Sequence, residues 1–202
     1  MEKVWNAVET LRRNHESLRH GDLPVDVFSL VEIDLRLNVI PFDDLLRKYD
    51  VEAALRADFT GIYVDAETYV FLDTGPEWKL NRLRFSLGHE VGHFVLHRDL
   101  PQPRNFASLP DFARWTRNFD LPHEGLKYSA EQEANEFAGR LLVPVERLRD
   151  FYDEFRTQAA GLFPVLYPSL REAFASNAAS KFGVNKQVIE VRLDREGIWP
   201  AQ

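Results

Sequence analysis

Apolar side chains recur at helical spacing in the first third of the chain. Residues 1–20 place them at every third or fourth position and Gly21 ends the pattern, which predicts an amphipathic helix. A second helical pattern covers residues 24–37 and leads into a short β-like run, VIPF, at residues 39–42. Charges interrupt every apolar run in residues 43–57, so we expect a short helix and a loop there.

The hydrophobic period changes at Gly61. Residues 61–73, GIYVDAETYVFLD, are rich in β-branched and aromatic side chains and are broken by the polar stretch DAET. This pattern predicts two antiparallel strands joined by a tight turn. With residues 39–42 they would form a small three-stranded antiparallel sheet. The segment YVFLD is a candidate edge strand along which an extended peptide could pair.

Helical patterns dominate the rest of the chain. Residues 81–96 predict a largely buried helix, and residues 128–144 predict a second one. Between them, residues 99–125 contain four prolines and no sustained period, which is typical of a long functional connection. Beyond Pro168, two helices are separated by the turn FGVN, with Asn185 as the expected cap. We therefore expect an α+β fold, mainly helical, with the three-stranded sheet beside the first of these helices.

Composition narrows the classes of function. The chain has 202 residues, 25 of them basic and 32 acidic, and its net charge of −7 without a basic cluster disfavours direct nucleic-acid binding. Cysteine is absent, so a metal ion would need His, Asp or Glu ligands. No segment approaches the ~20 apolar residues of a membrane span, and no signal peptide is recognisable. We expect a cytoplasmic protein without membrane contact.

The stretch HEVGH combines two imidazoles and a carboxylate on one predicted helix. His89 and His93 are four residues apart, so both side chains lie on one helix face and can reach one ion. Glu90 lies ~100° around the helix, where it can contact a metal-activated water as a base. An HExxH sequence arises by chance in roughly one to two per cent of such chains. However, two core-facing histidines without partners would be costly, which favours a metal site.

A catalytic zinc needs a third protein ligand. His97 is ~12 Å along the helix from His89, which excludes it as a ligand of the same ion, and a cation close to the helix C-terminus is the simpler interpretation. The next helix offers Glu131 and Glu133, which point in different directions. One of these two completes the site. Glu131 is favoured because Asn135 on its own face could orient a metal-bound histidine.

The sequence resembles the ImmA/IrrE-type zinc metallopeptidases. The resemblance rests on RFSLGHEVGHFVLH, on EQEANEFAGRLLVP, which contains the pattern ExxA(N/D)xFA, and on the strand pattern just upstream. It extends from about Pro24 to Pro144. It implies a zincin-like core with one Zn²⁺ per chain in a gluzincin-like site. Carried over to this chain, the ligands are His89, His93 and Glu131, and the catalytic base is Glu90.

The resemblance also implies a function. Members of this family cut a helix-turn-helix repressor once and so relieve transcriptional repression. We therefore expect a metalloendopeptidase with a protein substrate and a role in transcription regulation. An oxyanion stabiliser is less evident from the sequence. Tyr128 and His123, just before the second motif, are candidates, although an ordinary tyrosine and histidine of a loop are the simpler interpretation.

Two other functions remain open at this point. The chain divides into an expected metallopeptidase domain, residues 1–145, and a C-terminal helical region, residues 146–202, with a helix-turn-helix-like rhythm. That rhythm allows a DNA-binding regulator, but Lys186 and Gln187 are the main polar side chains at the start of its second helix. A zinc-stabilised protein that binds a repressor without cutting it is the other alternative. Glu90 argues against it, because a structural zinc site has no use for a base.

Overall fold

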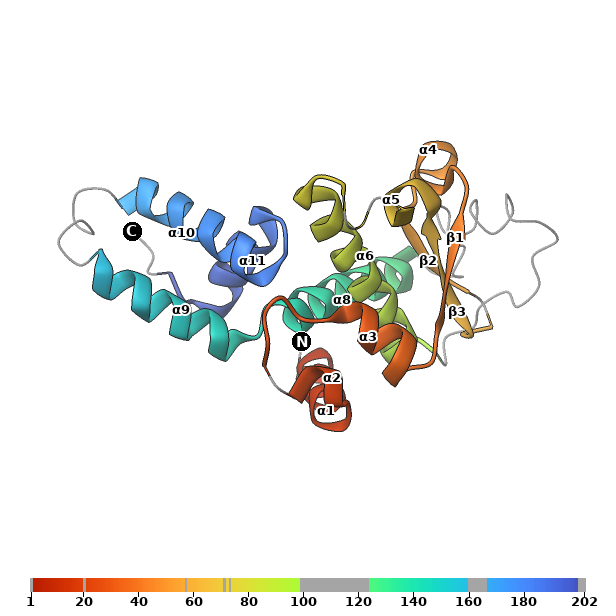
Figure 1. Cartoon of the computed structure of the whole chain (residues 1–202). Helices are drawn as coiled ribbons and strands as arrows, with labels where there is room; N and C mark the ends of the chain where they lie inside the picture. The colour runs from red at the N-terminus through yellow and green to blue at the C-terminus, as the bar shows by residue number, and fades with distance from the viewer. Residues whose placement is uncertain are drawn as a thin grey trace.

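Two long helices form the centre of the molecule. The computed structural model describes residues 2–19, 21–56, 58–70, 72, 74–98, 124–159 and 167–199. Helices α6 (Glu77–Leu96) and α8 (Glu124–Leu142) lie against each other, with the sheet at one end of the molecule and helices α9 to α11 at the other (Figure 1). Both start earlier than their sequence patterns predicted.

The N-terminal helices cover the central pair from one side. Helix α1 (Glu2–Asn14) buries Val4 and Val8 and contacts α8, and α2 (Glu16–Arg19) follows it. The predicted second helix is shorter than expected. It consists of α3 (Val27–Ser29) and a π-helical turn, η1 (Leu30–Asp34). It begins where Asp26 accepts a hydrogen bond from the backbone N–H of Ser29 at 3.0 Å.

The sheet is mixed, so the predicted purely antiparallel arrangement is wrong. Its strands are β1 (Asn38–Phe42), β2 (Ala53–Leu55) and β3 (Gly61–Asp65), in the order β1-β3-β2. Strands β1 and β3 are parallel, whereas β2 and β3 are antiparallel. The chain can return in parallel because α4 (Leu45–Tyr49) and β2 lie between them in sequence. A side chain at Gly61 would place a Cβ only 2.5 Å from the carbonyl oxygen of Asn38, so this pairing requires glycine.

The predicted hairpin after Gly61 does not form. Residues 66–70 are helix α5 (Ala66–Val70), so Tyr69 and Val70 belong to no strand. The cause is Asp65, whose carboxylate accepts hydrogen bonds from the backbone N–H and the hydroxyl of Thr68, at 3.0 and 3.1 Å. This capping begins a helix where the polar stretch had suggested a turn. The edge strand beside α6 is therefore β2.

Small residues bring α6 and α8 close together. A Cβ added at Gly92 would lie 3.1 Å from both the Cα of Ala134 and the Cβ of Phe137, and one at Gly88 would lie 3.4 Å from the Cβ of Ala138. Leu83, Leu87 and Val91 of α6 lie in the same core, fully buried. The backbones can therefore approach closely enough for polar side chains of both helices to meet.

Helices α9 (Val145–Gln158), α10 (Tyr167–Phe182) and α11 (Lys186–Glu196) form the other end of the molecule (Figure 1). They pack around Phe174, whose ring contacts Tyr152 and Trp199. Asn185 is the N-terminal cap residue of α11, as predicted, although its side chain makes no capping hydrogen bond. Among the described residues, no helix has the length and apolar character needed to span a membrane.

Candidate metal centre

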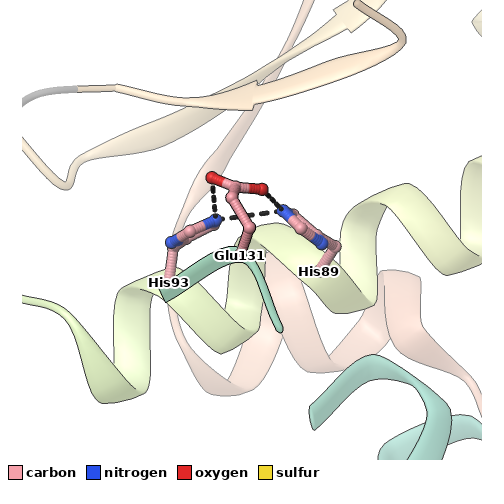
Figure 2. Close-up of side chains that lie close together, drawn as sticks. All are labelled: His89, His93 and Glu131. Carbon is pink, nitrogen blue, oxygen red and sulfur yellow. Dashed lines mark hydrogen bonds and ion pairs between the residues drawn. The ribbon is translucent and has the colours of Figure 1, made fainter. Parts of the chain in front are cut away.

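The side chains of three residues from α6 and α8 converge on one point. His89 and His93 approach each other with their Nε2 atoms 3.0 Å apart. The two carboxylate oxygens of Glu131 lie 3.3 Å from Nε2 of His89 and 3.5 Å from Nε2 of His93 (Figure 2). The spacing of the histidines on α6 and the close packing of α8 produce this arrangement.

The donor set fits a divalent metal ion. The candidate ligand atoms of His89, His93 and Glu131 all lie within 4.8 Å of one another, and within the described part of the chain no other such cluster of His, Asp and Glu was found. Two imidazole nitrogens and one carboxylate are the ligands of many catalytic zinc sites, which keep a further position open for water or substrate. The residues can therefore hold a metal ion.

Electrostatics agree with this assignment of Glu131. Burial opposes ionisation of its carboxyl group, but the contacts with His89 and His93 outweigh burial and lower its pKa. The carboxylate is therefore charged at neutral pH, which is the form that binds a metal.

Asn135 orients one of the histidines. Its Oδ1 lies 3.0 Å from Nδ1 of His89. Because an amide oxygen can only accept, this contact requires a proton on Nδ1 of His89, so Nε2 is the nitrogen available to a metal ion. The contact is the kind of outer-layer interaction expected from the sequence.

Glu90 faces the same cleft but stands apart from the three converging side chains. Its Oε2 accepts a hydrogen bond from the backbone N–H of Leu55 in β2, at 2.7 Å. Burial raises the pKa of its carboxyl group, and the neighbouring His89 and His93 partly oppose this effect. A carboxylate with a raised pKa beside a metal site is suited to accept a proton.

The helices that carry these side chains lie within a match to a known protein family. Residues 77–194 match the peptidase M78 family, described as an IrrE N-terminal-like domain. The chain belongs to this family. The match covers more than half of the chain and extends past Pro144, where the resemblance in sequence had ended, to the last turn of α11. A search among curated proteins found no match.

The cleft of this M78 family member has a volume of about 370 Å³. The three converging side chains and Glu90 form one wall, and residues 50–55, which include β2, form another. Phe85 and Ser86 of α6 and Asn135 of α8 complete the lining. The cleft thus places the edge of β2 opposite the candidate metal ligands.

The contacts of His97 and Glu133 beside the cluster were not recognised from the sequence. His97 is only 3% exposed, and its Nδ1 lies 3.0 Å from Nδ1 of His93. Its Nε2 lies 3.1 Å from Oε2 of Glu133. Burial lowers the pKa of His97, although Glu133 opposes this, so the expected cation at the helix end is wrong. The spacing of four residues between His93 and His97 was the available signal.

The two candidate oxyanion stabilisers fall outside this description. His123 is not among the described residues, and Tyr128 lies in α8 but its side chain is not described. The same holds for most of the proline-rich connection, since the described residues end at 98 and resume at 124. Their roles remain predictions.

Proposed function

We propose that the chain is a zinc-dependent endopeptidase. The observation that carries the proposal is the convergence of His89, His93 and Glu131 on one point, with Glu90 beside them on the cleft wall. A structural zinc site is usually closed by four protein ligands and needs no base. Three ligands with a free carboxylate nearby favour hydrolysis.

The side chains have distinct roles in the proposed reaction. His89, His93 and Glu131 would hold the zinc ion, which supplies a Lewis acid for water and for the peptide carbonyl. Glu90 accepts the proton of the attacking water and later gives it to the leaving amine. The hydrogen bond from Leu55 to Oε2 of Glu90 fixes the carboxylate during both transfers.

The substrate would bind as an extended strand along β2. The carbonyl of Glu52 and the N–H of Arg56 bond to β3, so the backbone groups of Ala53 and Leu55 point away from β3. The N–H of Leu55 meets Glu90, which leaves the N–H and C=O of Ala53 to pair with a peptide in the cleft. Main-chain pairing sets the register of the substrate and adds little sequence specificity.

The substrate we propose is a helix-turn-helix repressor in the cytoplasm, cut once so that repression is relieved. The resemblance of both motifs to the ImmA/IrrE-type peptidases supports this choice. Coexpression of the chain with a candidate helix-turn-helix repressor from the same genome would test it, with mass spectrometry as the readout. We expect two fragments from a single cleavage with the wild type and none with Glu90→Gln. A repressor that is bound but intact in both cases would instead support the non-proteolytic alternative.

A further inference from the structure

A series of polar contacts leads away from His93 to residues that do not line the cleft. The Nδ1 atoms of His93 and His97 are 3.0 Å apart, and Nε2 of His97 is 3.1 Å from Oε2 of Glu133. Nζ of Lys3 in α1 lies 3.4 Å from the same carboxylate oxygen. The contacts thus connect α6, α8 and α1.

The donor and the acceptor in each of these contacts can be assigned by starting from Glu133. A carboxylate paired with Lys3 can only accept, so the contact with Glu133 requires a proton on Nε2 of His97. The other ring nitrogen of neutral His97, Nδ1, then accepts from His93. His93 therefore carries a proton on Nδ1, and its Nε2, which lies next to Glu131 and His89, is the nitrogen that would bind the metal ion.

We propose that His97 and Glu133 are positioning residues that hold His93 in the tautomer and ring orientation needed to bind the metal ion. The inference rests on the metal-binding part of the proposed function. In this role His97 orients His93 as Asn135 orients His89, whose Nδ1 lies 3.0 Å from Oδ1 of Asn135. Each histidine then has its own outer partner, and α8 contributes to both, because it carries Asn135 and Glu133.

Burial argues against a purely packing role for His97. Its ring nitrogens have two polar contacts while the residue is only 3% exposed, so loss of either partner would leave a buried polar atom unsatisfied. A side chain present for packing alone would be apolar at this position. Glu133 is about a third exposed and contacts His97 across the helix interface.

The experiment compares variants that keep or remove the acceptor facing His93. His97→Phe keeps a ring but removes the acceptor, whereas His97→Asn can place an amide oxygen near the position of Nδ1. Glu133→Leu removes the carboxylate, whereas Glu133→Gln retains an accepting oxygen. His15→Phe is the matched control, because His15 lies outside the site. Its Nδ1 is 3.8 Å from Oδ1 of Asp34.

Zinc affinity, measured by competition with a chelator, is the first readout. We expect His97→Phe and Glu133→Leu to lower it by about 10- to 100-fold, the usual cost of losing an outer partner of a ligand. His97→Asn and Glu133→Gln should recover most of the affinity, and His15→Phe should match the wild type. Equal affinity in His97→Phe and His15→Phe would overturn the proposal, as would failure of both conservative variants to recover it.

The second readout is nitrogen NMR of the imidazole rings in the metal-free wild type. It needs no variant, so misfolding of a variant cannot affect it. We expect His93 in the wild type to carry a proton on Nδ1, and an unprotonated Nδ1 on His93 would overturn the proposal. Absence of zinc binding in the wild type would defeat the proposed function and the inference together. Zinc binding with the expected affinity pattern but no cleavage would defeat only the peptidase.

Discussion

Glu90 and Leu55 connect the candidate base to the strand on which a substrate would lie. The backbone N–H of Leu55 donates to Oε2 of Glu90 at 2.7 Å, although 35 residues separate the two in sequence. A shift of β2 would therefore also move the carboxylate. Substrate pairing at Ala53, two residues before Leu55, and proton transfer at Glu90 depend on the same strand.

Replacement of Glu90 by Gln should separate catalysis from folding. The amide oxygen of Gln can still accept from Leu55, but the amide cannot take up a proton, so we expect wild-type zinc content and melting temperature without detectable cleavage. Metal analysis, thermal denaturation and a cleavage assay on the same preparation measure all three. A variant that still cleaves would move the role of base to another residue.

Glu131 and Glu133 offer a matched pair of substitutions. Each change to Gln removes one negative charge from the same helix, so a general electrostatic effect would be equal in both. Glu131 approaches both His89 and His93, whereas the histidine that Glu133 contacts is His97. We expect Glu131→Gln to lose most of its zinc and Glu133→Gln, which keeps an acceptor for His97, to stay near one equivalent per chain. Metal loss confined to Glu133→Gln would reverse the assignment.

Removal of the metal should also destabilise the fold, because a metal ion that binds only the folded state adds to its stability. Free zinc at about a hundred times its dissociation constant contributes about 2.7 kcal/mol. We therefore expect a chelator to lower the melting temperature by about 5–10 °C. His93→Ala keeps only two of the three donors and should bind little zinc. A chelator should therefore not lower its melting temperature. A chelator effect of equal size in both proteins would point to a metal bound elsewhere.

The sequence predicted the residues that converge in the site but not all of their surroundings. Helical spacing alone placed His89 and His93 on one face, and the pattern of the next helix favoured Glu131 over Glu133. Both predictions depend on regular helices, whose geometry is known in advance. The contact between His97 and Glu133 could not be derived in the same way, because it depends on how α6 and α8 pack.

The sheet was harder to predict because its signals are local and weak. Strand β2 is only Ala53–Leu55, buried along its whole length, and so lacks the alternation that identifies a strand. Residues 66–70 have the composition of a strand, but the capping of Thr68 by Asp65 makes them helical. Pairing with β3 decided the first case, and a local capping contact decided the second.

Gly92 should be more important for the site than its lack of a side chain suggests. A Cβ there would lie 3.1 Å from Ala134 and Phe137, so Gly92→Ala should push α8 away from α6 and displace Glu131 from the histidines. Such overpacking costs about 1–3 kcal/mol, which the better helix propensity of alanine, about 1 kcal/mol, offsets only in part. We expect a lower melting temperature and weaker zinc binding.

Gly139 provides the control for this prediction. It is also a buried helical glycine, but a Cβ there would meet only Cδ of Arg192, at the ordinary van der Waals distance of 3.4 Å. Gly139→Ala should therefore keep wild-type zinc affinity and melt at the same temperature or higher. Chelator competition and thermal denaturation of both variants provide the comparison. If Gly92→Ala bound zinc as tightly as Gly139→Ala, close approach of the helices at Gly92 would not be what positions Glu131.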